Sequence, residues 1–177
     1  MRCYTRIGDK RKTHLFGCKL YKYSERVEAI GTIDELNAFL GAAASFSPHK
    51  ISKKIIHEIE NNLFSIGAEL AIPKSVKIKA KHVERLEVLV EKIDEKLPQQ
   101  TKFVIPAGTQ AAMMLNVART VARRAERAMV KLSSTSKVNP EMLKYMNRLS
   151  SLLYVLLRFE NYKNNIVEKN PVYNQIR

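Results

Sequence analysis

Apolar residues recur every three or four positions along most of this chain, the spacing that places them on one face of a helix. The pattern predicts five helices, over about residues 31–46, 48–72, 83–97, 110–132 and 141–162. The sequence shows no strand–helix alternation and no internal repeat. The predicted fold is therefore all-α, a five-helix antiparallel bundle that follows an irregular N-terminal loop.

Local sequence signals set the predicted helix boundaries. Thr32 and Glu35 have the spacing of a capping box, so Thr32 is the expected N-cap of the first helix. Pro48 suits the first position of the second helix. Pro73 and Pro98 are expected to end the second and third helices.

The length of 177 residues fits a single domain with a self-sufficient core. We divide it into an N-terminal loop (1–25), the helical bundle (26–162) and a basic, Asn-rich tail (163–177) with weak structural signals. Within the bundle, residues 99–109 form an irregular connection between the third and fourth helices.

The net charge of +14 favours polyanionic partners: nucleic acid, anionic lipid or phosphorylated small molecules. Solubility alone would also account for it. No apolar run approaches the roughly 20 residues that span a bilayer, and the N-terminus shows no secretory signal. Cys3 and Cys18 are too few for a disulfide framework. We therefore expect a cytoplasmic protein with free thiols and no membrane association.

Two stretches concentrate charge. The segment YTRIGDKRKTHLFG, residues 4–17, places a Gly-Asp-Lys turn among five Lys, Arg and His side chains. On the fourth predicted helix, the 100° step per residue places one carboxylate and three guanidinium groups on a single face, while Arg124 points elsewhere. That face comprises Arg119, Arg123, Glu126 and Arg127.

The arginine face has several interpretations. Guanidinium groups suit bidentate phosphate binding, but a solvated charged face, or an interface that pairs with acids of another subunit, fits the same residues. Nucleic-acid binding is a further alternative, although no helix-turn-helix, zinc-finger or aromatic RNA-binding motif supports it. The opposite face is an expected buried stripe formed by Ala111, Leu115, Ala118, Val121 or Ala122, Ala125, Met129 and Leu132.

The fifth predicted helix also has two faces. Its expected apolar side contains Tyr145, Leu149, Leu152, Leu156 and Phe159, and its polar line contains Asn147, Ser151, Tyr154 and Arg158. Asn147 is compatible with an ordinary helix-packing amide as well as with a binding role.

Together these stretches resemble the PduO-type ATP:cob(I)alamin adenosyltransferases, a family of corrinoid adenosyltransferases. The matching segments occur in family order and at family spacing over about residues 4–160. They are residues 4–17 with Lys22, RVEAIGTIDELN (26–37), FVIPAG (103–108), ARTVARRAER (118–127) and NRLS (147–150). Each motif alone is weak, whereas the ordered set is specific.

The resemblance implies an enzyme that transfers the 5′-deoxyadenosyl group of ATP to the cobalt of cob(I)alamin, giving adenosylcobalamin and triphosphate. It also implies Mg²⁺ with the ATP, and a homotrimer with active sites between subunits. A cob(II)alamin reductase and an adenosylcobalamin-dependent enzyme are the implied partners, with no nucleic acid. A non-catalytic protein that binds and delivers adenosylcobalamin is the alternative. The missing Walker A motif argues against the P-loop class that runs the same reaction.

The resemblance also assigns roles to residues. Catalytic roles fall to Arg123, Phe103 and Asn147. ATP would be bound by Thr5, Arg6, Ile7, Gly8, Asp9, Lys10, Thr13, His14, Lys22, Arg123, Glu126, Arg127 and Asn147. Glu126 would position Mg²⁺ or orient the arginines, although a purely structural ion pair is the other interpretation. Closely spaced backbone N–H groups in the opening loop would form an anion-binding nest.

Four residues carry implied roles around the corrin and the interface. Asp34 and Arg119 match a salt bridge across the subunit interface. Phe103 and Asn116 would face the corrin, and Phe103 would keep a lower axial ligand off cobalt; from the residue alone, core packing is the simpler interpretation. Departures from the usual family residues are Ile7, Arg11, Cys18, Asn116 and Ser151. They bear on rate and corrin affinity more than on the reaction.

Overall fold

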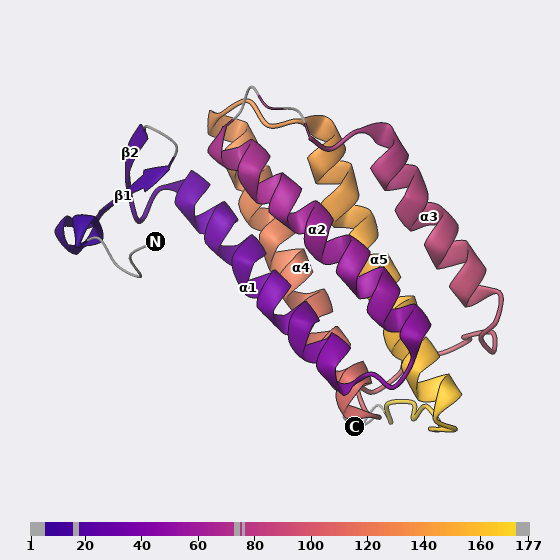
Figure 1. Ribbon diagram of the computed structural model, residues 1–177. Helices are drawn as coiled ribbons and strands as arrows, with labels where there is room; N and C mark the ends of the chain where they lie inside the picture. Colours follow the sequence, from indigo (N-terminus) through magenta and orange to yellow (C-terminus); the bar gives the residue numbers. More distant parts are fainter. Residues whose placement is uncertain (1–5, 16–17, 73–74, 76, 173–177) are drawn as a thin grey trace, which may run out of the picture.

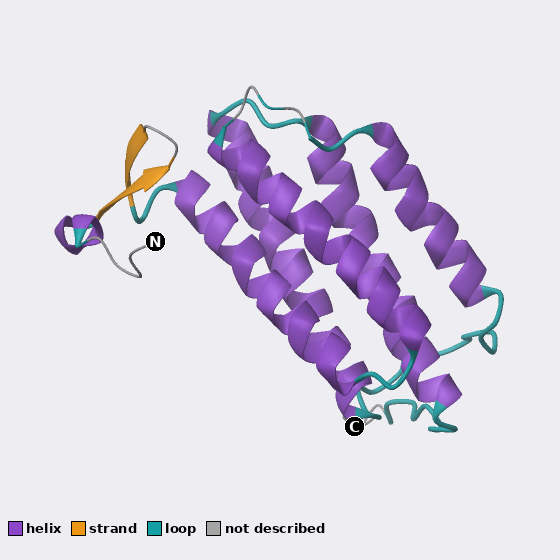
Figure 2. Ribbon diagram, viewed as in Figure 1, coloured by secondary structure: helices purple, strands orange, loops and turns teal. Residues whose placement is uncertain are grey.

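Five helices contain nearly all the buried apolar side chains of the described residues, with Ile78, which precedes the third helix, as an exception (Figures 1 and 2). The computed structural model describes residues 6–15, 18–72, 75 and 77–172. Within these residues the helices are α1 (Glu25–Phe46), α2 (Lys50–Ala71), α3 (Ala80–Asp94), α4 (Gln110–Thr135) and α5 (Pro140–Lys163). The predicted all-α, five-helix bundle is confirmed.

The packing order of the helices differs from their order in the sequence. Helix α1 packs against both α2 and α4, and α4 packs against α5, while α3 lies along α5 (Figure 1). Successive pairs along the series α2, α1, α4, α5 run antiparallel. Helices α3 and α5 run in the same direction, because Arg148 pairs with Glu87 and Arg158 lies by Asp94 farther along both helices.

The core confirms the predicted apolar faces. The stripe on α4 is buried at Ala111, Leu115, Ala118, Val121, Ala122, Ala125, Met129 and Leu132. On α5, Tyr145, Leu149, Leu152, Leu156 and Phe159 are buried as well. The Tyr145 hydroxyl accepts a hydrogen bond from Asn62 Nδ2 at 3.2 Å. Burial raises the pKa of Tyr145 well above its ordinary value, because the charged phenolate would lose its water.

The predicted start of the first helix is wrong. Helix α1 begins at Glu25, after Ser24 in the N-cap position, and Thr32 is buried inside it. The Thr32 hydroxyl donates to the carbonyl oxygen of Glu28 at 2.8 Å. A threonine inside a helix can satisfy its hydroxyl in this way, so the capping-box spacing did not mark a helix end.

Proline positions also set boundaries less closely than expected. Helix α2 begins at Lys50 with His49 in the N-cap position, so Pro48 lies before the helix and the prediction for it is wrong. Helix α3 ends at Asp94, and hydrogen-bonded turns follow it before Pro98. Pro73 lies outside the described residues. Helix α5 does use a proline at its start, since Pro140 follows the cap residue Asn139.

The N-terminal segment is more regular than predicted. A 3₁₀ turn, η1 (Ile7–Lys10), precedes a hairpin of the strands β1 (Lys12–Leu15) and β2 (Cys18–Tyr21). The strands are antiparallel, with Thr13 opposite Leu20 and His14 opposite Lys19. Figure 1 shows this hairpin projecting beyond the start of α1, away from the body of the bundle. Cys3 and Thr5 lie outside the described residues.

Candidate active site

A polar pocket lies on the outer side of α4 where it meets α5. Arg123, Glu126, Arg127, Val130 and Asn147 line it, and its volume is about 300 Å³. The alanine stripe on the opposite side of α4 is packed into the core, which fixes the direction of these side chains. The structure thus brings together four residues that the sequence assigned to ATP. Arg124 lies outside this pocket and pairs with Glu35 of α1.

Hydrogen bonds orient the Asn147 amide in this pocket. Its Nδ2 donates to Glu126 Oε1 at 2.8 Å, while its Oδ1 accepts from Arg148 at 2.8 Å. Arg148 in turn donates to Glu87 Oε1 of α3 at 2.8 Å. Neither Arg148 nor Glu87 was predicted to belong to the site. For Arg148 the only signal in the sequence was its position next to Asn147. For Glu87 the sequence held no signal.

The charges in the pocket suit a phosphorylated ligand. Arg123 and Arg127 supply two guanidinium groups, and the Arg127 Nη1 donates to the Arg123 carbonyl oxygen at 3.1 Å. Glu126 supplies one carboxylate, and the described residues contain no group of three or more His, Cys, Asp or Glu that could hold a metal alone. One carboxylate beside a polyphosphate fits Mg²⁺, which usually binds substrate phosphates with one or two carboxylates.

The N-terminal segment gathers a second group of predicted residues. A Cβ added at Gly8 would lie 3.1 Å from Lys22 Nζ, so the lysine ammonium packs over this glycine. The Lys22 amide also donates to the Arg11 carbonyl at 3.0 Å. Arg6 and Arg11 flank η1, and both adopt left-handed backbone conformations, with φ of 59° and 60°. The predicted ATP-binding residues of this segment, among positions 6–14 and at Lys22, will be called the cradle. The structure brings the start of the cradle against Lys22.

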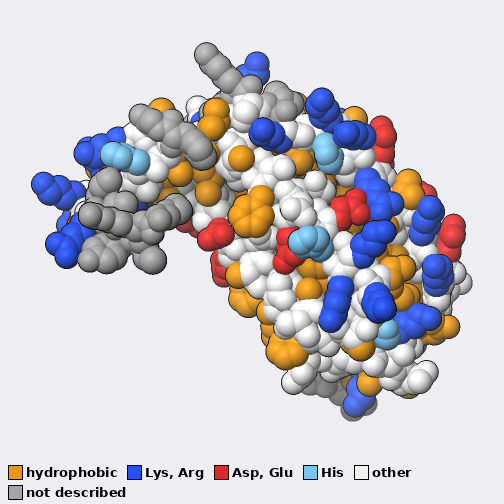
Figure 3. Space-filling model, in the orientation of Figure 1, with side chains coloured by type: hydrophobic (Ala, Val, Ile, Leu, Met, Phe, Trp, Pro, Cys, Tyr) orange, Lys and Arg blue, Asp and Glu red, His pale blue; other side chains and the backbone are white. Residues whose placement is uncertain are grey.

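The remaining cradle residues follow along the same segment. Asp9 and Lys10 lie in η1, and Thr13 and His14 lie in β1. Cations surround this end of the molecule, as Figure 3 shows. The cavity that Thr13 and Leu15 line shares no residue with the α4–α5 pocket. In the described part of one chain, the two predicted halves of the ATP site therefore line different pockets.

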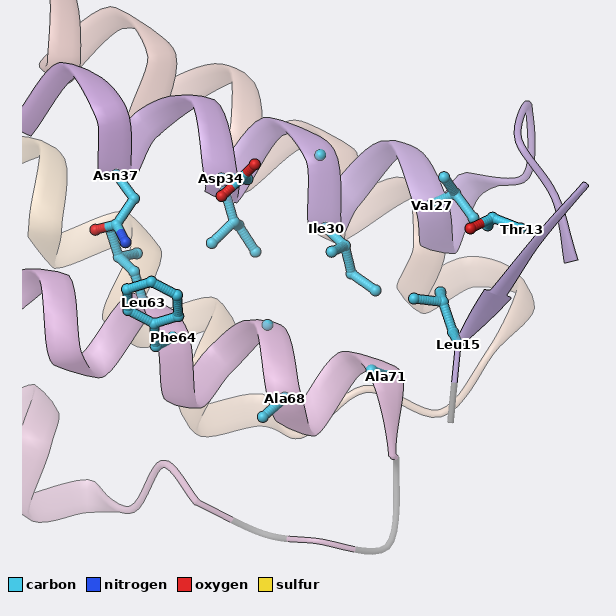
Figure 4. A pocket seen from close by; sticks show the side chains of 13 residues that line it. Thr13, Leu15, Val27, Ile30, Asp34, Asn37, Leu63, Phe64, Ala68 and Ala71 are labelled. Carbon is cyan, nitrogen blue, oxygen red and sulfur yellow. The ribbon is translucent and has the colours of Figure 1, made fainter. Parts of the chain in front are cut away.

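A larger cavity lies between the hairpin, α1 and α2, as Figure 4 shows. Its volume is about 450 Å³, and its lining is mainly apolar. Thr13 and Leu15 of the hairpin, Asp34 of α1 and the exposed Phe64 of α2 are among its walls. The polar chemistry is concentrated in the smaller pocket, so this cavity does not by itself indicate a nucleotide site.

Phe103 lies in the loop between α3 and α4, and its side chain is 77% exposed. The core-packing interpretation of Phe103 is therefore wrong. Just beyond it, Val104 and Ile105 share a small cavity of about 50 Å³ with Asn116 and Arg119 of α4. The structure thus brings the Phe103 loop and Asn116 to one end of the bundle.

Asp34 and Arg119, the predicted salt bridge across the interface, do not pair with each other within the described part of one chain. Arg119 Nε donates to Asn116 Oδ1 at 3.0 Å, and Asp34 is exposed on α1. Among the described residues, neither Asp34 nor Arg119 has an ion-pair partner closer than 4.0 Å. Both charges are therefore available to another molecule.

Comparisons with known proteins agree with the helical-bundle fold. The family model described as cobalamin adenosyltransferase matches residues 3–160. A corrinoid adenosyltransferase of Bacillus subtilis is 38% identical, over 94% of this chain and 90% of its own length. Corrinoid adenosyltransferase PduO of Citrobacter freundii is 37% identical, over 96% of this chain but 53% of its own length.

Solved structures show the same likeness. A variant of the PduO-type ATP:corrinoid adenosyltransferase from Lactobacillus reuteri, complexed with cobalamin and ATP, has a TM-score of 0.92 and 34% identity. The alignment covers 96% of each chain. A second variant of that enzyme, complexed with ATP, has a TM-score of 0.88, with coverage of 97% of this chain and 99% of that one.

The fold and the relatives thus define a helical-bundle adenosyltransferase. The chain belongs to the cobalamin adenosyltransferase family. The described helices include none with the length and apolar character needed to cross a bilayer.

Proposed function

We propose that this protein transfers the 5′-deoxyadenosyl group of ATP to the cobalt of cob(I)alamin. The Co(I) centre attacks the C5′ carbon of the ribose, so a Co–C bond forms as the C5′–O bond breaks. The leaving triphosphate takes the electron pair of that bond. The observation that carries this proposal is the pocket in which Arg123, Arg127, Glu126 and Asn147 converge.

The cationic groups stabilise the departing triphosphate. Negative charge builds up on its oxygens in the transition state, where fixed donors lower the barrier most. Arg123 and Arg127 supply bidentate donors. The hydrogen bonds from Asn147 to Glu126 and from Arg148 to Asn147 hold the amide in one orientation before ATP arrives. Glu126 would hold Mg²⁺, and the ion would supply further positive charge against the phosphates.

We infer that each active site forms between two subunits of a homotrimer. The separation of the two half-sites within one chain supports this arrangement, because a neighbouring copy can supply the missing half. The cradle of one subunit would then meet the α4–α5 pocket of the next. Asp34 and Arg119, both without an ion-pair partner within the described chain, would pair across that interface.

The corrin would bind at the Phe103 end of α4. The exposed Phe103 ring would cover the lower face of the corrin and exclude a lower axial ligand from cobalt. Asn116 lies nearby and would also face the corrin. A cobalt centre without that ligand accepts an electron more readily, which favours the Co(I) nucleophile.

The cellular context follows from the proposed chemistry. We propose that the reaction takes place in the cytoplasm, which supplies ATP and is reducing enough for a Co(I) nucleophile. The protein would receive its reduced corrinoid with the help of a cob(II)alamin reductase and pass its product to an adenosylcobalamin-dependent enzyme.

An anaerobic absorbance assay tests the reaction. Chemically reduced cob(I)alamin, Mg²⁺ and ATP are mixed with and without the protein. We expect protein-dependent loss of the Co(I) band, light-sensitive adenosylcobalamin and an equal amount of triphosphate. Persistence of Co(I) while ATP or corrinoid still binds would replace the proposal with the carrier function.

A further inference from the structure

The segment that follows α5, residues 164–172, will be called the C-terminal arm. In Figure 1 it runs along the foot of the bundle, beside the start of α4. Its main attachment is Arg158 of α5, whose side chain is only 5% exposed. Arg158 Nε donates to Glu168 Oε1 at 2.9 Å, and its Nη2 donates to the Pro98 carbonyl at 2.8 Å. One buried guanidinium therefore joins α5, the arm and the beginning of the Phe103 loop.

The arm also holds the centre of that loop. The Ile105 amide donates to the Lys169 carbonyl at 2.7 Å. The Asn170 Nδ2 donates to the Phe103 carbonyl at 2.8 Å. These two hydrogen bonds fix the backbone on either side of Val104, while the Phe103 ring remains exposed.

The far end of the loop is fixed by α5. Asn161 is buried, its Nδ2 donates to the Ala107 carbonyl at 2.8 Å, and its Oδ1 accepts from the Thr109 amide at 3.1 Å. The loop is thus held at its start, centre and end. Of these attachments, those to its centre come only from the C-terminal arm, whereas α5 holds its two ends.

We propose that Glu168 and Asn170 are positioning residues for the corrin site. They act through the backbone of residues 103–105 and set the direction in which the Phe103 ring projects. This inference rests on the proposed function, in which Phe103 covers the lower corrin face. Neither residue lines the α4–α5 pocket, so their loss affects the corrin and leaves ATP binding unchanged.

The test uses the full-length variants Asn170→Ala and Glu168→Gln, with Val167→Ala as the matched control. Val167 belongs to the same arm and is 83% exposed. Steady-state kinetics give KM for cob(I)alamin and for ATP. Electron paramagnetic resonance of cob(II)alamin with bound ATP reports whether a lower ligand reaches cobalt. Hydrogen exchange of the Ile105 amide, measured without substrates, reports the loop itself.

We expect Asn170→Ala to speed hydrogen exchange of the Ile105 amide. It should also raise KM for cob(I)alamin about fivefold, the change that the net free energy of one hydrogen bond typically produces. Glu168→Gln should have the larger effect, because it removes the closer of the two charge partners of the buried Arg158 guanidinium. In both variants the electron paramagnetic resonance spectrum should show a larger fraction of cob(II)alamin with a lower axial ligand. KM for ATP and the values for Val167→Ala should match the wild-type protein.

Two results would overturn the inference. Faster Ile105 exchange with an unchanged corrin KM and spectrum would mean that the arm holds the loop without positioning the corrin. An equal rise in KM for ATP and for corrin would mean a general structural role. If Glu168→Gln fails to fold, Asn170→Ala still decides. Failure of the proposed function is separate, since it would appear as no turnover in the wild-type protein.

Discussion

The two halves of the candidate ATP site are built in different ways. The α4–α5 pocket lies on long helices whose other faces are packed into the core. In the N-terminal segment, residues 6–22, none of the side chains whose burial the structure describes is fully buried. Its backbone is instead held by η1, a short hairpin and the hydrogen bond from the Lys22 amide to Arg11. One half is fixed by packing, and the other by local hydrogen bonds.

This difference bears on how charge is prepared for catalysis. Side chains on packed helices hold their positions before the ligand binds, and such preorganised charge contributes most to the chemical step. A segment with little buried surface has a low local stability. Part of the free energy of ATP binding is therefore used to order this segment. We expect the helical half to govern kcat and the N-terminal half to govern KM for ATP.

The largest expected effect is that of Arg123→Ala. Loss of one preorganised donor to the departing charge should lower kcat by roughly 10²–10³. The bundle should stay folded, because the Arg123 side chain is exposed. Turnover and thermal unfolding of the purified variant measure both effects.

Arg124→Ala is the matched control, since it removes the neighbouring guanidinium, which pairs with Glu35. Its kcat should stay within about twofold of wild type, because an exposed ion pair contributes less than about 1 kcal/mol to stability. Normal turnover in a folded Arg123→Ala protein would remove Arg123 from the site.

Lys22→Ala should have an intermediate effect. The ammonium over Gly8 would contact the triphosphate in the ground state as well as in the transition state. Its loss should therefore raise KM for ATP about tenfold with little change in kcat. Lys19→Ala, an exposed lysine of the same hairpin, is the control and should behave as wild type. A fall in kcat at an unchanged KM would contradict the assignment.

Mixing the two variants sharpens the comparison. Co-refolded Lys22→Ala and Arg123→Ala chains would form sites that combine an intact cradle with an intact α4–α5 pocket. Random assortment gives about one quarter intact sites if each site takes its halves from two subunits. Assayed at low ATP, the mixture should then exceed either variant alone. No recovery would place both halves in one chain.

The smallest expected effect concerns Arg11, which has a φ of 60°. An L-residue in this left-handed conformation is strained by about 1 kcal/mol, and glycine avoids that cost. Arg11→Gly and Arg11→Ala both remove the cation, so their difference isolates the backbone. The Lys22 amide donates a hydrogen bond to the carbonyl of residue 11. Hydrogen exchange of this amide should be about fivefold slower in Arg11→Gly than in Arg11→Ala. Equal exchange would show that the strain is relieved elsewhere.

Helical periodicity predicted most of the bundle because burial repeats along each helix. The α4 stripe and the arginine face were predicted together, since a fixed 100° step determines both. The start of α1 was missed because the Thr32–Glu35 spacing also occurs inside helices. The hairpin was missed because β1 and β2 are four residues each and only partly buried, too short for alternation to be distinctive.

Contacts between distant segments were beyond sequence reasoning. Asn147 was predicted as a site residue, but its hydrogen bond to Glu126 and the link through Arg148 to Glu87 depend on how α3, α4 and α5 pack. The same holds for Arg158 and Glu168. The sequence pattern assigned Arg158 to a polar face of α5, and only the path of the C-terminal arm shows that this buried guanidinium pairs with Glu168.

The attachment of the Phe103 loop to α5 has a consequence for how this family varies. Gly108 has a φ of 135°, and a Cβ at that position would lie 1.9 Å from Asn161 Oδ1. A side chain at position 108 would take the space of the Asn161 amide, and the φ of Gly108 disfavours any other residue there as well. Where relatives replace this glycine, they should therefore also lose the asparagine, whereas loss of the asparagine alone should leave the glycine in place.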